Sequence, residues 1–374
     1  MKSFKAGKYI NQGYYKSFQP ELLLKQWTFD DMPMLNLLSK ADRHLGRLDM
    51  YSEYVNIDLF IKMHIAKEAT QSSKIEGTQT NIEDAFLPKK DVSTEKREDW
   101  EEVQNYISAM NEAVTLLHTL PFSSRLIKQT HKILLHGVRG KHKHPGEYRT
   151  SQNWIGGASI NDAVFIPPNQ NSVPELMSDI EKFANEELLN IPDLLKIAII
   201  HYQFETIHPF LDGNGRVGRL LITLYLVDKG ILKRPILYLS DYFERNRTLY
   251  YDNLMRVRTH NDLNHWLKFF LNGIIETSKK GVETFDAILQ LQKYAEQKLK
   301  DAGSRSLDAL KVVQAMYNMP IMDAQQATGI IGKSINTTYK TIALLEEVGI
   351  IKEITGAQRG KLYAFDDYLK LFEN

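Results

Sequence analysis

The chain of 374 residues contains no cysteine, which excludes disulfide bonds, thiolate metal sites and a cysteine nucleophile. It also has no excess of charge to attract nucleic acid or an anionic membrane, because 47 Lys and Arg stand against 46 Asp and Glu. No apolar run approaches the length of a membrane span, and residues 1–15 lack the apolar core of a signal peptide. These absences indicate a protein of a reducing compartment, and we expect it in the cytoplasm with no membrane contact.

Helical periodicity is the dominant pattern, since apolar residues recur at helical spacing over most of residues 35–299. The predicted helices span residues 35–48, 58–73, 100–117, 124–135, 172–187, 193–207, 215–229, 248–256, 264–275 and 277–299. We therefore expect a mainly α protein with four regions. They are an N-terminal helical region over 1–97, a helical core over 98–276, a connecting helix over 277–303 and a C-terminal domain over 304–374.

The most informative segment runs from His208 to Arg219 and reads His-Pro-Phe-Leu-Asp-Gly-Asn-Gly-Arg-Val-Gly-Arg. Asn190 looks like the N-cap of a helix that precedes it, and the apolar run from Val217 onward predicts a helix that follows it. A glycine-rich loop that opens a helix is a ready site for phosphate. The glycine spacing also fits a dinucleotide fingerprint, but the strand which that motif requires before it is missing.

Each functional group of this segment suits chemistry on a nucleotide. His208 can accept the proton of a hydroxyl nucleophile, because an unperturbed imidazole has a pKa of about 6.5. Asp212 can bind Mg²⁺, which commonly takes one or two protein carboxylates together with substrate phosphates, or it can cap the next helix. Arg216 and Arg219 lie three apart on that helix and could clamp charge on the phosphates. Phe210 is expected in the core.

The pattern His-x-Phe-x-Asp-Gly-Asn-Gly-Arg-x-x-Arg resembles the signature of the Fic family, whose members with the full motif are protein adenylyltransferases. The resemblance implies a Fic-type helical bundle with a short β-hairpin flap. It implies transfer of AMP from ATP, with Mg²⁺, to a Ser, Thr or Tyr hydroxyl of a target protein or of the chain itself. The residues that it assigns to ATP are Gly213, Asn214, Gly215, Arg216, Val217, Gly218 and Arg219, with Tyr250 and Tyr251 on the adenosine side or, equally, in the core.

A second part of the resemblance lies upstream, where Ser72-Ser73-Lys74-Ile75-Glu76-Gly77 matches the family's inhibitory motif. Gly77 should end the helix and leave Glu76 in its last turn, where the helix dipole disfavours an anion. A carboxylate in that position suggests a partner from outside the helix. The resemblance makes Arg219 that partner, so that Glu76 would keep the basal activity low.

The flap is expected between Asn153 and Pro167, where apolar residues flank two pairs of turn residues. In the resemblance it follows the element Gly146-Glu147-Tyr148-Arg149 and aligns an extended segment of the target protein by main-chain pairing. A purely structural hairpin is the alternative.

The C-terminal domain has the pattern of a winged helix-turn-helix, with helices over 307–316, 322–328 and 334–348 and wing strands over 350–354 and 362–365. From residue 301 onward, however, eight Lys and Arg stand against nine Asp and Glu, whereas DNA-binding domains are usually basic. We therefore favour homodimerisation or protein docking over DNA binding.

Two other readings of the chain stay open. A Fic-fold enzyme could move another phosphate-containing group or remove AMP, and a transcriptional regulator could use the loop only to sense ATP.

A metal site made of His131, His136, His142 and His144 is disfavoured, because the first two do not share a helical face and the others lie in a lysine-rich loop.

Overall fold

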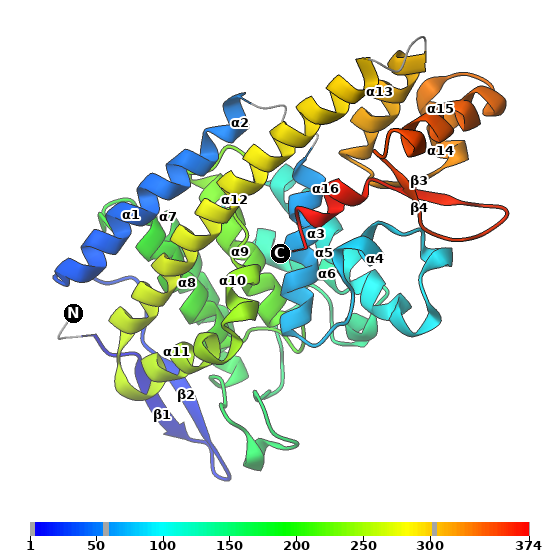
Figure 1. The fold of residues 1–374 in the computed structure, drawn as a ribbon. Coiled ribbons are helices and arrows are strands. Elements are labelled where there is room, and N and C mark those ends of the chain that lie inside the picture. Colours follow the sequence, from blue (N-terminus) through cyan, green and yellow to red (C-terminus); the bar gives the residue numbers. More distant parts are fainter. Residues whose placement is uncertain (1–3, 55–59, 301–304, 374) are drawn as a thin grey trace.

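The computed structural model describes residues 4–54, 60–300 and 305–373, and these form a mainly helical protein (Figure 1). The helices before the C-terminal domain are α1 (Met32–Asp49), α2 (Tyr51–Tyr54), α3 (Ile61–Ile75), α4 (Ile82–Phe86), α5 (Arg97–Leu116), α6 (Ser124–Leu134), α7 (Val173–Asn185), α8 (Asp193–Ile207), α9 (Asn214–Asp228), α10 (Ser240–Arg245), α11 (Arg247–His260) and α12 (Leu263–Lys300). The start of the helix predicted from residue 58 lies outside the described residues. Within those residues, no helix combines the length and apolar character needed to cross a bilayer.

Two helices at the centre, α8 and α9, position the candidate site. Nearly every side chain of α8 is buried, because apolar residues occur all around this helix rather than on one face. It begins at Asp193 with Pro192 as N-cap, so the prediction that Asn190 is the N-cap was wrong. Asn190 instead has φ +49°, a left-handed turn that Asn tolerates well.

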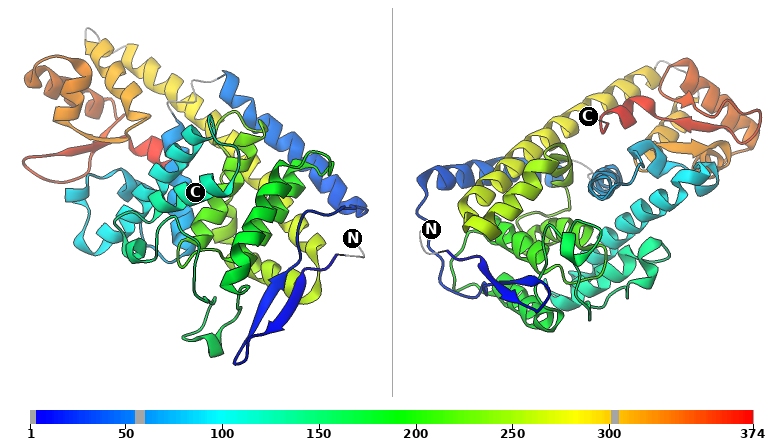
Figure 2. Two further views of the ribbon diagram at one scale, coloured as in Figure 1. Left: turned by 180° about the vertical axis from the view of Figure 1, so that it is seen from behind. Right: turned by 90° about the horizontal axis from the view of Figure 1, so that it is seen from below.

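An N-terminal hairpin of β1 (Gly7–Asn11) and β2 (Lys16–Pro20) was not predicted from the sequence. Most of β1 is exposed, so the alternation of apolar and polar residues that signals a half-buried strand is missing there. The hairpin lies beside the flap, where the Phe18 amide donates to the Ile166 carbonyl at 2.9 Å. Both views of Figure 2 place this hairpin at the end of the molecule opposite α14 and α15 of the C-terminal domain.

The flap is a loop closed by one antiparallel bridge between Ile155 and Phe165. The Ile155 amide donates to the Phe165 carbonyl at 2.8 Å, and a short 3-10 turn spans Ile160–Asp162 at the tip. Trp154 and Val164 beside the bridge are exposed. The predicted hairpin is thus present in a reduced form, with its backbone largely unpaired.

The helices predicted over 264–275 and 277–299 form the single helix α12, because no proline or turn sequence interrupts them. It packs along α1 and leads to the C-terminal domain (Figure 1). That domain contains α13 (Ser306–Met316), β3 (Ile321–Asp323), α14 (Ala324–Ile331), α15 (Ile335–Glu347), β4 (Lys352–Glu353), β5 (Leu362–Ala364) and α16 (Asp366–Lys370).

The C-terminal domain agrees with the predicted order of three helices and two wing strands, and adds one strand and the short helix α16. Asp323 caps α14, so this helix begins two residues later than predicted, and Ile321–Asp323 instead pairs with β5. The sheet order is β3-β5-β4, all antiparallel. The function of this domain stays a prediction.

Candidate active site

His208 terminates α8 in the left-handed conformation, with φ +49°. Arg149 holds this turn, since its Nε donates to the His208 carbonyl at 2.9 Å and its Nη2 donates to the Ile207 carbonyl at 3.3 Å. Asn153 of the flap donates to the same His208 carbonyl at 3.2 Å. A non-glycine residue in this conformation costs about 1 kcal/mol or more, so these bonds fix where the imidazole points.

The imidazole of His208 is neutral at physiological pH. Burial, together with the guanidiniums of Arg149 and Arg258, lowers its pKa to about 3. Its Nδ1 has no hydrogen-bond partner among the described residues. The neutral side chain lines the adjoining cavity.

The loop from Phe210 to Gly213 is closed by its own side chains. Asn214 accepts from the Phe210 amide at 2.8 Å through Oδ1 and donates to the Phe210 carbonyl at 2.9 Å through Nδ2. Gly213, the N-cap of α9, has φ +74°, where glycine carries no Cβ penalty. Asn214 was also predicted to contact phosphate through its side chain, and that contact stays a prediction; in this structure the side-chain amide closes the loop.

The N-terminus of α9 offers backbone amides to an anion, since the first amides of a helix have no partner within it. These amides belong to Asn214, Gly215 and Arg216. Val217 does not contribute, because it is fully buried and its amide donates to the Gly213 carbonyl. Gly218 lies a turn further along.

Gly218 lies at the contact between α9 and α8. A Cβ on this residue would lie 2.3 Å from Oε1 of Glu205, so a larger residue here would require the Glu205 side chain to move. Val217 and Gly218 are both buried, and their predicted contacts with phosphate stay predictions.

Arg216 is buried and already paired. Its Nη1 lies 2.9 Å from Oε2 of Glu102, a residue of α5, and its Nη2 lies 3.5 Å from Oδ1 of Asp212. The sequence predicted that Arg216 clamps charge on the phosphates, and this stays a prediction. In the structure Arg216 holds Asp212 from one side.

The side chain of Asp212 is 40% exposed, so its carboxylate is accessible to solvent. Its carbonyl lies 3.0 Å from Nε2 of His131, whose Nδ1 accepts from the Gly146 amide at 2.8 Å. Because Nδ1 is an acceptor, Nε2 carries the proton and donates to Asp212. His131 also stacks on Phe210, with ring centroids 3.7 Å apart.

A single exposed carboxylate beside a phosphate site fits Mg²⁺, which keeps several waters and takes few protein ligands. Asp212 is such a group. Within residues 4–54, 60–300 and 305–373, no group of three or more His, Cys, Asp or Glu could hold a metal ion by itself. Any Mg²⁺ at Asp212 would therefore depend on oxygens of the substrate.

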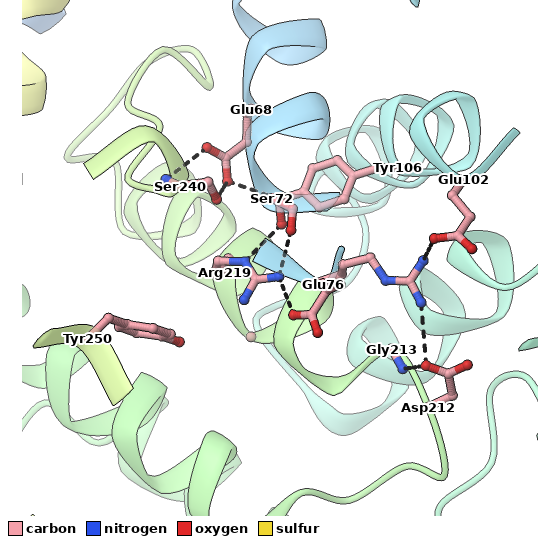
Figure 3. Close-up of polar contacts among 12 residues, drawn as sticks. Glu68, Ser72, Glu76, Glu102, Tyr106, Asp212, Gly213, Arg219, Ser240 and Tyr250 are labelled. Carbon is pink, nitrogen blue, oxygen red and sulfur yellow. Dashed lines mark hydrogen bonds and ion pairs between the residues drawn. The ribbon is translucent and has the colours of Figure 1, made fainter. Parts of the chain in front are cut away.

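Glu76 reaches the site from the end of α3 and forms an ion pair with Arg219, as Figure 3 shows. Its Oε1 lies 2.6 Å from Nη2 of Arg219, which is only 1% exposed. Ser72, one turn earlier, accepts from Nε of Arg219 through Oγ and from Nη2 through its carbonyl, both at 2.9 Å. Gly77, with φ +102°, ends the helix as predicted.

The carboxylate of Glu76 lies where an anionic ligand of α9 would lie. A Cβ on Gly215 would stand 2.3 Å from Oε1 of Glu76, so this oxygen sits directly above the first turn of α9. Burial alone would raise the pKa of Glu76, but the Arg219 guanidinium outweighs it and holds the pKa below its usual value. A charged carboxylate thus occupies the anion site.

A cavity of about 530 Å³ is lined by His208, Arg219 and Glu76. Tyr250 and Tyr251 line it, so both predicted residues face the cavity, although the Tyr250 hydroxyl also lies 2.8 Å from Nε2 of His201. The remaining lining residues are Trp154, Ile155, Gly156, Val164, Phe165, Glu205, Gly215, Arg247, Leu254, Met255 and Arg258. The flap, His208, Arg219 and Glu76 at the end of α3 therefore line one cavity.

Comparison with known proteins identifies the family of this chain. Residues 35–115 match the profile of the Fic/DOC family N-terminal region, and residues 121–226 match the profile of the Fic/DOC family itself. The chain belongs to the Fic/DOC family. A Fic family protein from Desulfovibrio desulfuricans has the same fold, with a TM-score of 0.59 at 19% identity over 91% of this chain and 98% of that one.

Curated Fic relatives align over a shorter part. A probable protein adenylyltransferase of Aquifex aeolicus is 43% identical over 89 residues, which are 24% of this chain and 26% of that protein. The protein adenylyltransferase fic-1 of Caenorhabditis elegans is 37% identical over 86 residues, or 23% of this chain and 16% of its own length. The chain thus matches about a quarter or less of these relatives.

Three residues that shape this Fic site could not be assigned from the sequence. Glu102 and His131 have no motif around them, and their partners lie 114 and 81 residues away. Arg149 was noted as part of a family element, but its contact with the His208 turn was not foreseen. Only packing brings these residues to the loop.

Proposed function

We propose that this protein is an adenylyltransferase that transfers AMP from ATP to a hydroxyl of a target protein, and that Glu76 keeps its basal activity low. The observation that carries the proposal is the position of the Glu76 carboxylate, 2.6 Å from Arg219 and above the first turn of α9. A carboxylate in this place imitates a phosphate oxygen, since arginine and helix N-termini bind both.

In the proposed reaction, the hydroxyl oxygen of a Ser, Thr or Tyr attacks the α-phosphorus of ATP. The bond between the α-phosphorus and the bridging oxygen breaks, and pyrophosphate leaves. His208 takes the proton of the hydroxyl, for which its depressed pKa keeps it unprotonated. Catalysis is then chiefly positioning and electrostatic stabilisation, and no covalent enzyme intermediate is needed.

After Glu76 has left Arg219, ATP would enter the cavity with its phosphates at Gly215 and Arg219 and its base toward Tyr250, Tyr251 and Leu254, which line it. Mg²⁺, when bound, would neutralise charge on the phosphates, and Asp212 is the residue that would hold it. Arg216 and His131 keep Asp212 in place through its carboxylate and its carbonyl.

The flap would present the target. Its segment Asn153 to Pro167 has one bridge, and Trp154 and Val164 stand exposed beside it. Unpaired backbone next to the catalytic histidine can add an extended segment of another protein by main-chain hydrogen bonds. A homodimer and a cytoplasmic location, both expected from the sequence, also stay predictions.

The test uses ATP labelled at either the α or the γ phosphate, with Mg²⁺ and a mixture of candidate target proteins. Covalent label from the α position alone supports transfer of AMP, and it should require His208. Label from the γ position alone would show phosphorylation and would refute the proposal. Loss of label already bound to protein would indicate removal of AMP instead.

A further inference from the structure

The first turn of α3 contacts the C-terminal domain, at the end of the helix opposite Glu76 (Figure 1). The ring of Phe60, which precedes this turn, lies edge-on to Tyr317 with centroids 5.2 Å apart, and 6.5 Å from Tyr368. The ring of His64 lies edge-on to Phe372 at 5.0 Å. Phe60 and the three aromatic residues of the C-terminal domain are each at most 2% exposed.

His64 is also held from the other side, because it stacks on Phe285 of α12 with centroids 4.4 Å apart. Its Nδ1 lies 3.1 Å from the Phe60 carbonyl, whereas its buried Nε2 has no hydrogen-bond partner among the described residues. Burial of this nitrogen without a hydrogen bond costs free energy, so aromatic packing must stabilise the buried His64 ring. The packing partners are α12 and the last residues of the chain.

Further along, α3 is fixed at two more points. Glu68 accepts from the Ser240 amide at 3.2 Å and from the Tyr106 hydroxyl at 3.1 Å (Figure 3). One turn later, Ser72 and Glu76 hold Arg219. The inhibitory helix is therefore anchored at its beginning, its middle and its end.

An α-helix moves as a stiff rod, and the twelve residues from His64 to Glu76 correspond to about 18 Å. If Glu76 leaves Arg219 by a shift of α3, the first turn must shift as well. The aromatic contacts with Phe372 and Tyr368 oppose that shift. Whatever loosens these contacts lowers the free energy needed to expose Arg219.

We propose that the C-terminal domain acts as a brace on the inhibitory helix, and that separating Phe372 and Tyr368 from its first turn frees Glu76 to leave Arg219. The brace rests on the proposed self-inhibition. It gives the domain a regulatory role that requires no DNA, since a partner that draws the end of the chain away from α3 would activate the enzyme.

The test compares three brace variants with one matched control. Phe372→Ala removes the contact from the domain side, Phe372→Leu removes the ring but keeps an apolar side chain, and Phe60→Ala removes the contact from the helix side. Tyr339→Ala is the control, because it deletes an aromatic ring of the same domain that is 52% exposed on α15. Melting temperatures establish which variants remain folded.

Hydrogen exchange of the amides from residue 72 to residue 76 is the first readout, and the initial rate of AMP incorporation is the second. We expect both to increase at least about fivefold in the folded brace variants and to stay unchanged in Tyr339→Ala, a typical size for coupling between two sites. In a Glu76→Gly background the brace variants should add nothing to the rate, since the inhibitory contact is already absent.

Unchanged exchange in folded Phe372→Leu and Phe60→Ala would overturn the brace. So would an equal increase in the Tyr339→Ala control, or a further rise in rate on top of Glu76→Gly. Failure of the proposed function would give a different experimental result. In that case even Glu76→Gly incorporates no AMP, while hydrogen exchange still reports whether the C-terminal domain holds α3.

Discussion

Replacement of Glu76 by glycine is the most direct perturbation of the site. The carboxylate lies 2.6 Å from Nη2 of Arg219, and that arginine is 1% exposed, so the substitution removes a charge-assisted hydrogen bond from a nearly buried guanidinium. Ser72 still holds Arg219 by two bonds at 2.9 Å, which should keep the guanidinium in place. Residue 76 follows the last residue of α3 with φ −87°, a conformation that glycine can adopt.

The magnitude follows from the bond that is lost. A hydrogen bond to a charged group contributes about 1.5 to 3 kcal/mol, and each 1.4 kcal/mol is a factor of ten. If ATP must displace this bond before its γ-phosphate can reach Arg219, the rate of AMP transfer should rise about 10- to 150-fold in Glu76→Gly. Arg219 also loses its counter-charge, so the melting temperature without ATP should fall and the stabilisation by ATP should grow.

Initial rates of incorporation from α-labelled ATP measure the effect, at target concentrations that do not limit the reaction. Lys74→Gly is the matched control, since it places glycine in the same exposed last turn and leaves the carboxylate in place. An equal increase in Lys74→Gly would mean that a loosened helix end, and not the ion pair, limits activity. No increase in Glu76→Gly would refute the argument.

The same ion pair predicts how inhibition depends on pH. Arg219 holds the pKa of Glu76 below its usual value, so the pair is intact above that usual value and is lost only as the pH falls through the lower, folded pKa. The ratio of the Glu76→Gly rate to the wild-type rate should therefore stay constant from about pH 6 to about pH 9. A ratio that collapses near neutral pH would contradict the assignment of Arg219 as the partner.

Three further predictions concern the reaction and the core. In the Glu76→Gly background, His208→Ala should lower AMP transfer about 10²- to 10⁴-fold, and the pH profile measured with His208 present should show no acid limb near pH 6.5, because burial lowers this pKa to about 3. A limb near 6.5 would point to another base. Asp212→Asn should raise the Mg²⁺ concentration needed for half-maximal rate about tenfold, measured by titration after chelation, whereas an unchanged requirement would remove Asp212 as the ligand. Burial raises the pKa of Glu205 to about 7, so the folded protein keeps a proton that the unfolded chain releases, and stability should fall as the pH rises from about 4.5 to 7. Glu205→Gln should therefore be more stable than wild type by up to about 3 kcal/mol in urea unfolding at pH 8, with little difference at pH 5.

The sequence alone determined the local parts of this site. The spacing from His208 to Gly215 contains a helix end, a loop and a helix start, and each is specified by neighbours in the chain. The resemblance also placed Glu76 with Arg219, although 143 residues separate them, because both positions belong to known motifs. Helix α12 shows the limit of local patterns, since two predicted helices form one.

Tertiary structure decided which of these polar groups remain available to a ligand. Arg216 and Asn214 have the chemistry of phosphate ligands, but packing gives the first to Glu102 and the second to the loop backbone. Burial, which the sequence did not reveal, moved the pKa of His208 from its usual value to about 3. The physical reason is that local spacing fixes neighbours within a turn, whereas hydrogen-bond partners and the loss of water depend on segments that only the fold brings together.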